Sequence, residues 1–400
     1  MLGVAGVAWA ADHPELVGFD ELMTSFVKAQ RVPGAALAVT KDSRLVYARG
    51  FGLADRARAQ TVQPTALFRI ASISKPLTAV ATMQLVEREK LALDASVWEV
   101  LALPAPSDAR WKRVTILHLL QHRGGWDRGS TGFDPMFQSV QIAKTQNVPP
   151  PAEPQHIVRY MVGRRLDFDP GSRYAYSNFG YCLLGRVIER VSGVAYEAYV
   201  QQEVLAPLGI RRMRLGKTLP AQRADDEVAY YANDEGTGPA VMGTVGERVP
   251  MPYGAWSLEA MDSHGGWLAS AVDLVRFASA FDVPATCKIL KEKSIETMFA
   301  RPDGAAGYDA RGAPRALYYG CGWRVRPVGR GRVNTWHTGS LPGTSTLLVR
   351  RHDGKNWAAL FNTRHAPDKQ RLSDKIDGLL HKAADGVRRW PSTDQFTQLL

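Results

Sequence analysis

Cysteine is scarce in this sequence, with only Cys182, Cys287 and Cys321 among 400 residues. They lie far apart and show no spacing typical of metal ligands, so we expect no bound metal. The odd count excludes a framework in which every cysteine is paired, although a single disulfide bond stays open. Cys182 falls in the apolar stretch YCLLGRVIERV and is interpreted as a small core residue.

Long apolar runs are also missing. No stretch approaches the roughly 18 continuous apolar residues of a membrane span, so stable membrane insertion is not expected. The start, MLGVAGVAWAADHPE, has an A-x-A pattern at Ala8, Trp9 and Ala10 but lacks the basic residues of a secretory signal. Two interpretations of residues 1–13 stay open: a signal-peptide remnant of a periplasmic or secreted protein, or the N-terminal arm of a cytoplasmic one.

Acidic side chains are outnumbered, since 39 Asp and Glu stand against 50 Lys and Arg, giving a net charge of +11. A nucleic-acid-binding surface needs its basic residues clustered, and here they are scattered along the chain. The densest group, RVRPVGRGRV at 324–333, is predicted to be a hairpin loop between strands. We therefore expect no nucleic-acid partner.

Strand-like segments occur near both ends of the chain, and helical patterns dominate the middle. Two apolar runs flank a polar KDSR turn in residues 35–55, which predicts a β-hairpin. Further strand-like runs are LYYGCGWRVRP, RVNTWHTG, STLLVRR and WAALFNT. These patterns predict an α/β (α+β) fold, with one antiparallel sheet built from both termini, flanked by helices and interrupted by a mainly helical insertion.

The same patterns suggest where the parts begin and end. We expect an α/β domain from residues 14–80 plus 262–390, a mainly helical insertion at 81–261 and a C-terminal tail at 391–400. Residues 127–157 are interpreted as loop-like and residues 216–262 as loop and short strand, because proline and glycine interrupt them. Four aromatic residues near these loops are candidates for pocket walls, with a position on the surface or in the core as the alternative: Trp126, Tyr253, Trp256 and Trp267.

A serine and a lysine stand three residues apart where a short strand enters a helix, in FRIASISKPLTAVATMQLVE (68–87). Residues i and i+3 of a helix are neighbours, so Lys75 can reach the Ser72 hydroxyl. Serine becomes a good nucleophile when a base removes its proton, and a desolvated lysine can serve as that base. Helix-start N–H groups would also favour an oxyanion there. The alternative is an N-cap serine with a solvated lysine.

Two later stretches carry further polar candidates. In YAYSNFGY, Tyr176 can act as a general acid or base and Asn178 can orient a lysine or a substrate amide, although a plain helix start is the alternative. In TWHTGSLPG, His337 precedes Gly339, where a backbone can pass close to a ligand; the alternative is an ordinary turn.

Taken in order, Ser72-x-x-Lys75, Tyr176-x-Asn178 and the triplet from His337 to Gly339 resemble the motifs of the serine β-lactamase and penicillin-binding protein superfamily. The flanking stretches FRIASISKPLTA, LLQHRGGW, YSNFGYCLLGRVIERVSG and GGWLASAVDLVRFA resemble the branch that holds class C β-lactamases, DD-peptidases, D-aminopeptidases and family VIII esterases. The resemblance covers about residues 20–385.

The resemblance implies acyl transfer without any metal or organic cofactor. Ser72 would attack an ester, amide or β-lactam carbonyl, and Lys75 and Tyr176 would share the general base and acid roles. The N–H groups of Ser72 and Ser340 would form the oxyanion hole. Asn178 would orient Lys75 and the substrate.

His337 departs from the pattern, because class C β-lactamases and DD-peptidases usually carry lysine there. A histidine with an ordinary pKa is mostly neutral at pH 7. Histidine variants are typical of esterase and D-aminopeptidase members, so a carboxylesterase acting on short-chain esters is the leading hypothesis. The alternatives are a D-amino-acid amidase or DD-peptidase, a β-lactamase, and a catalytically idle scaffold or penicillin-binding protein. The natural substrate and the oligomeric state stay open.

Overall fold

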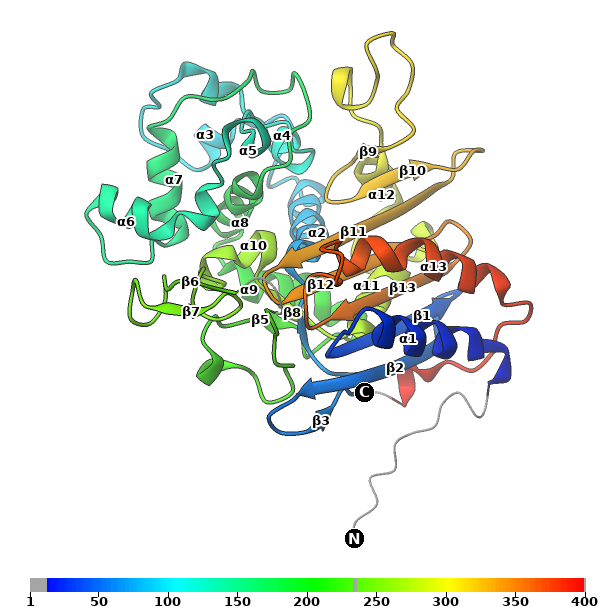
Figure 1. Cartoon of the computed structure of the whole chain (residues 1–400). Coiled ribbons are helices and arrows are strands. Elements are labelled where there is room, and N and C mark those ends of the chain that lie inside the picture. The colour runs from blue at the N-terminus through cyan, green and yellow to red at the C-terminus, as the bar shows by residue number, and fades with distance from the viewer. Residues whose placement is uncertain (1–12, 233–235, 399–400) are drawn as a thin grey trace.

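The computed structural model describes residues 13–232 and 236–398 (Figure 1). The hypotheses about residues 1–13 therefore lie, apart from His13, outside the described residues. An eight-stranded antiparallel sheet has the order β3-β2-β1-β13-β12-β11-β10-β9. Its strands are β1 (Gly34–Lys41), β2 (Arg44–Asp55), β3 (Gln60–Thr61), β9 (Tyr318–Tyr319), β10 (Arg324–Pro327), β11 (Val333–Leu341), β12 (Thr344–Arg350) and β13 (Lys355–Phe361).

The two ends of the chain meet in the middle of this sheet. β1 pairs with β13, with Ala35 opposite Phe361. The predicted antiparallel sheet flanked by helices is confirmed, and segments from both ends supply its strands. β10 and β11 form the hairpin that the sequence predicts around residues 324–333.

Both faces of the sheet are covered. Side chains alternate along a strand, so Ala36 and Ala38 of β1 face one core while Leu37 and Val39 face the other. Helices α1 (Val17–Ala29) and α13 (Leu372–Gly386) lie together on the second face, as Figure 1 shows, and α11 (Ala271–Ser279) packs on the first.

Helices gather beside the sheet, with α3 to α8 forming a group at one side in Figure 1. The remaining helices are α2 (Ser74–Glu87), α3 (Val97–Val100), α4 (Ile116–Leu120), α5 (Arg128–Thr131), α6 (Ser139–Gln146), α7 (Pro154–Val162), α8 (Asn178–Ser192), α9 (Tyr196–Tyr199), α10 (Asp262–Gly265) and α12 (Glu292–Phe299). Two small sheets complete the fold, one of β4 (Phe68–Arg69), β8 (Trp267–Ala269) and β5 (Arg214–Leu215), the other of β6 (Thr237–Pro239) and β7 (Arg248–Pro250).

The loop-like interpretation of residues 127–157 is wrong. This segment contains α5, α6 and the start of α7. Ile142 and Ala143 are fully buried, and Asn147 ends α6 in the left-handed conformation. Tertiary burial of one short apolar face thus stabilises α6. The prolines and glycines on either side of it make this helix hard to predict from the sequence. The domain boundaries given above stay predictions.

The cysteines are all free in the structure, and Cys182 is fully buried in α8. Its interpretation as a core residue therefore agrees with its position. Within residues 13–232 and 236–398, no helix combines the length and apolar character needed to cross a membrane.

Candidate active site

Ser72 lies in a tight turn between β4 and α2. A single 3-10 turn, Ala71–Ile73, joins the two elements, and Ala71 has a φ of 47°. A non-glycine residue in the left-handed region is uncommon and costs about 1–3 kcal/mol, so the surrounding packing must hold it. Ser72 is half-buried, whereas Ser74 and Lys75 behind it are fully buried. The turn therefore exposes the hydroxyl that the sequence predicts to be the nucleophile.

The amino group of Lys75 lies at the centre of the site. Lys75 Nζ is 3.1 Å from Ser72 Oγ, and it donates to Asn178 Oδ1 at 2.9 Å and to the carbonyl oxygen of His264 at 2.8 Å. The i, i+3 spacing thus brings the lysine to the serine as predicted. Burial, and next the positive charge of Arg128, hold the pKa of Lys75 well below its usual value, so the free amine is favoured.

Tyr176 lies beside the same serine. Lys75 Nζ is 4.8 Å from the centre of the Tyr176 ring, and the guanidinium carbon of Arg128, in α5, is 4.9 Å from the same ring centre. Burial raises the pKa of the Tyr176 phenol above its usual value, although a side-chain hydrogen bond with Ser72 and the charge of Arg128 act in the opposite direction. Burial thus shifts Lys75 toward the free amine, a proton acceptor, and Tyr176 toward the protonated phenol, a proton donor.

Asn178 begins α8 and is buried. The side chain of Ser177 accepts from the backbone N–H of Gly180, so Ser177 is the N-cap and leaves Asn178 free to bind elsewhere. Asn178 Oδ1 accepts from Lys75, and Asn178 Nδ2 donates to Asp134 Oδ2 at 2.8 Å. The structure thus brings Asn178 to Lys75, as the resemblance implies.

β11 forms the opposite wall. His337, Thr338 and Ser340 line the cavity in front of Ser72. Gly339 does not line it: a Cβ there would lie 2.1 Å from the carbonyl oxygen of Ile70. Gly339 therefore lets β11 pack against the chain just before Ser72. The sequence suggests that the backbone at Gly339 passes close to a ligand, but in the structure it passes close to this turn.

Both ring nitrogens of His337 are engaged. Nδ1 is 2.8 Å from the carbonyl oxygen of Thr338, which can only accept, so Nδ1 carries the hydrogen. Nε2 is 2.9 Å from the hydroxyl of Tyr319 and accepts from it. Burial, and then the charge of Lys75, hold the pKa of His337 well below its usual value. The ring is therefore neutral at pH 7.

A cavity of about 350 Å³ opens in front of Ser72. Among the residues that the structure describes, the lining includes four arginines and no aspartate or glutamate: Arg128, Arg324, Arg364 and Arg371. Arg364 also donates to Ser340 Oγ at 2.9 Å. None of these arginines was identified from the sequence, because they come from segments without a motif and only folding brings them together. The described lining of the cavity is therefore rich in arginine, although His337 is neutral.

The four aromatic candidates belong to the core rather than to this cavity. None of them lines it, and Trp126, Trp256 and Trp267 are buried. Tyr253 packs against Tyr230 with ring centres 6.1 Å apart. No group of three or more histidine, cysteine or acidic residues arranged to hold a metal ion occurs in the part of the chain that the structure describes.

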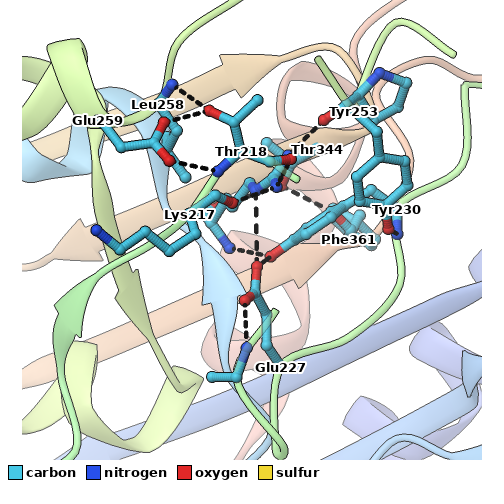
Figure 2. Close-up of polar contacts among 12 residues, drawn as sticks. Lys217, Thr218, Glu227, Tyr230, Tyr253, Leu258, Glu259, Thr344 and Phe361 are labelled. Atoms are coloured by element: carbon cyan, nitrogen blue, oxygen red, sulfur yellow. Dashed lines mark hydrogen bonds and ion pairs between the residues drawn. The ribbon is translucent and has the colours of Figure 1, made fainter. Parts of the chain in front are cut away.

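Arg69, three residues before Ser72, anchors the long segment between β5 and α10. Its side chain is fully buried and donates to the carbonyl oxygens of Pro252 at 2.6 Å and Lys217 at 2.8 Å (Figure 2). Its guanidinium lies 3.6 Å from Glu227 and 4.4 Å from the centre of the Tyr230 ring. Tyr230 itself donates to Glu227 at 2.8 Å. One buried cation thus fixes loops that carry little regular structure.

This network predicts a large stability effect. Arg69→Met should lower the free energy of unfolding by about 3–5 kcal/mol, because the carboxylate of Glu227 would lose its buried counter-charge. Urea unfolding followed by tryptophan fluorescence would measure it. The matched control, Arg212→Met, breaks the half-exposed pair with Asp226 and should cost under about 1 kcal/mol. Equal losses in the two variants would contradict the anchoring role.

The chain matches known proteins over most of its length. A model of the Beta-lactamase family matches residues 19–380. Esterase EstB of Burkholderia gladioli is 32% identical over 253 residues, covering 62% of this chain and 62% of that protein. Penicillin-binding protein 4* of Bacillus subtilis (strain 168) is 28% identical over 327 residues, covering 80% of this chain and 65% of that protein. The chain thus spans under two thirds of the length of these curated relatives.

Solved structures agree with the fold. The octameric penicillin-binding protein homologue from Pyrococcus abyssi is similar with a TM-score of 0.68 and 26% identity, over 93% of this chain and 78% of that one. The D-amino acid amidase from Ochrobactrum anthropi SV3 has a TM-score of 0.69 and 21% identity, over 94% of this chain and 99% of that one, which supports the fold alone. With the family model matching from α1 into α13, the chain belongs to the beta-lactamase family, within the superfamily of serine β-lactamases and penicillin-binding proteins.

Proposed function

We propose that this protein is a serine hydrolase that forms an acyl-enzyme on Ser72 and acts chiefly on short-chain carboxylic esters. The arrangement of Ser72, Lys75 and Tyr176 supports the acyl-enzyme route. Lys75 Nζ lies within reach of Ser72 Oγ, and burial lowers its pKa, which favours the free amine that a base requires.

Acylation begins when Ser72 Oγ attacks the ester carbonyl and its proton passes to Lys75. The N–H groups of Ser72 and Ser340 stabilise the oxyanion that forms. Tyr176 protonates the departing alcohol as the carbon–oxygen bond of the ester breaks, and Lys75 restores the proton to Tyr176. Water then attacks the acyl carbon and gives a proton to Lys75. Lys75 passes that proton to Ser72 Oγ as the bond between Oγ and the acyl carbon breaks, and the carboxylic acid leaves.

Neutral His337 is the observation that favours esters. An ammonium at this position would offer a permanent charge to a substrate carboxylate, whereas the His337 ring is uncharged and both its nitrogens are already bonded. The esterase named among the relatives agrees with this preference.

The arginine-rich lining supports a second candidate. Arg324 and Arg371 could hold a carboxylate without help from His337, as an amidase, peptidase or β-lactamase substrate requires. The amidase and penicillin-binding proteins among the similar structures agree with this alternative.

One comparison of substrates separates the two candidates. We expect p-nitrophenyl butyrate to be turned over with a higher kcat/KM than benzylpenicillin or a D-alanine amide at pH 7.5. The rates are measured under matched conditions at two salt concentrations, because a carboxylate held by arginines should lose affinity at high salt. Faster hydrolysis of benzylpenicillin, with a KM that rises with salt, would replace the esterase proposal by the second candidate.

His337→Lys should narrow the gap between these substrates by lowering KM for benzylpenicillin. A charge-assisted hydrogen bond contributes roughly 1.5–3 kcal/mol, against about 1 for a neutral one, which corresponds to about a tenfold gain in affinity or somewhat more. Michaelis–Menten series on both substrates would measure it, with His337→Gln as a neutral control. An equal change in KM for the neutral ester would show that charge is not the cause.

A further inference from the structure

The hydrogen bonds of Lys75 decide whether it can act as a base. A neutral lysine amine has two N–H groups and one lone pair. The amide oxygen of Asn178 and the carbonyl oxygen of His264 both lie within 2.9 Å of Nζ, and both can only accept. They therefore occupy the two N–H groups. The lone pair is left for the third neighbour, Ser72 Oγ, at 3.1 Å.

This outcome depends on which end of the Asn178 amide faces Lys75. If the amide were rotated by half a turn, its NH₂ group would donate to the lone pair of Lys75 and occupy the base. Asp134 opposes that rotation, because its Oδ2 lies 2.8 Å from Asn178 Nδ2 and a carboxylate can only accept. The side chain of Asp134 is only 13% exposed, so solvent competes little for this contact.

Arg128 forms an ion pair with Asp134. Arg128 Nη1 lies 2.8 Å from the same Oδ2, and Asp134 Oδ1 accepts from the backbone N–H of Met136 at 3.2 Å. These two contacts hold the Asp134 carboxylate in place beside Asn178. Arg128 and Asp134 both come from the segment that the sequence suggests is a loop, on either side of the end of α5.

We propose that Asp134 is a positioning residue for the proposed acyl transfer, which fixes the Asn178 amide so that the lone pair of Lys75 points at Ser72, and that Arg128 is its counter-ion. The proposal rests on the proposed function, since it concerns how the base for Ser72 is kept available. The charges have opposite effects on Lys75: Asp134 raises its pKa, whereas Arg128 lowers it.

Polar and titratable side chains face Lys75 from every element packed around it. They are Ser72 from the turn before α2, His122 after α4, Arg128 from α5, Asp134 after α5, Tyr176 before α8, Asn178 and Tyr181 from α8, His264 from α10 and His337 from β11. Burial holds the pKa of each of the three histidines well below its usual value, and burial raises the pKa of both tyrosines. Of the groups around Lys75, Asp134 and Arg128 are therefore the ones whose substitution should change the charge near Lys75 and hence its pKa.

Two variants of Asp134 separate orientation from charge. Asp134→Ala removes the acceptor, and we expect kcat for p-nitrophenyl butyrate to fall by about tenfold to a hundredfold with KM within about threefold. Asp134→Asn keeps an amide oxygen that can accept from Asn178, so it should recover most of kcat. It removes the anion, so the pKa of Lys75 should fall and the acid limb of kcat/KM should move to lower pH.

Arg128→Gln should move the acid limb in the opposite direction, to higher pH, because a neighbouring cation is lost. The matched control is Asp353→Asn, which removes an equivalent carboxylate from the turn between β12 and β13, where it pairs with Arg351. That turn lies at one end of β12, whereas Ser345, which pairs with the cavity residue Ser340, lies at the other. Neither kcat nor the pH profile should therefore change. Thermal unfolding of each variant checks that the fold is intact.

Unchanged kcat in Asp134→Ala, or acid limbs that move in the same direction in Asp134→Asn and Arg128→Gln, would overturn the proposal. A loss in Asp134→Ala that Asp134→Asn does not recover would also overturn it, because orientation would then not be the cause. These outcomes differ from failure of the proposed function, which would appear as ester hydrolysis that does not need Ser72.

Discussion

Replacing Ser72 by alanine should lower kcat/KM for every substrate by at least about a thousandfold, because the change removes the atom that forms the acyl-enzyme. The fold should persist. Ser72 is half-buried in a turn, and Lys75 keeps its two accepting partners, Asn178 and the carbonyl of His264. We expect the free energy of unfolding to change by less than about 1 kcal/mol.

The measurement combines initial rates with labelling by a fluorescent phosphonate. The probe should add one adduct to the peptide that carries Ser72 in the unmodified protein and none in Ser72→Ala. Ser107→Ala removes the same atom at an exposed position in the helical region and serves as the control. Turnover close to normal in Ser72→Ala would refute the acyl-enzyme mechanism. Failure to label the unmodified protein, together with absent hydrolysis, would favour the idle scaffold.

Lys75→Ala and Tyr176→Phe should each lower kcat by about a hundredfold or more while raising KM little, because proton transfer belongs to the transition state. The two groups belong to one proton relay, because Lys75 restores the proton that Tyr176 gives to the alcohol, and Lys75 Nζ lies 4.8 Å from the centre of the Tyr176 ring. The double variant should therefore lose little beyond the worse single variant. Lys75→Met, which keeps most of the buried volume, controls for the cavity that alanine leaves.

A double-mutant cycle on p-nitrophenyl butyrate would measure this coupling. Losses in kcat that multiply would mean that Lys75 and Tyr176 act in separate steps, and one of the two roles would then be wrongly assigned. A large rise in KM with constant kcat would place either residue in substrate binding instead.

Local patterns made part of the fold and site predictable from the sequence. The spacing from Ser72 to Lys75 is three residues, so one helical turn brings the two side chains together whatever the rest of the chain does. Nearly continuous apolar runs in β1, β12 and β13 likewise predict strands, because a strand covered on both faces needs apolar side chains on both. The order of the motifs that carry Tyr176, Asn178 and His337 resembles that of a known family. This resemblance implied that the three residues lie close to Ser72 and Lys75.

Long-range packing made the rest unpredictable from the sequence. α6 lies in a stretch rich in proline and glycine, and its short apolar face becomes a helix only when Ile142 has a core to enter. Arg324, Arg364 and Arg371 are ordinary surface residues in the sequence, and the arrangement of β10, β11 and α13 turns them toward one cavity.

The sequence by itself determined the chemical groups of the site, a serine with a lysine one helical turn away and a histidine where the motif of class C β-lactamases, which the sequence resembles, usually has lysine. Only the tertiary structure decided their protonation states and contacts. Burial and the charge of Arg128 favour the free amine of Lys75, and burial favours the neutral ring of His337. The orientation of Asn178 depends on Asp134, which is 44 residues away in the chain. The physical reason is that desolvation and hydrogen-bond direction depend on every segment that packs around a group, and those segments come together only in the folded chain.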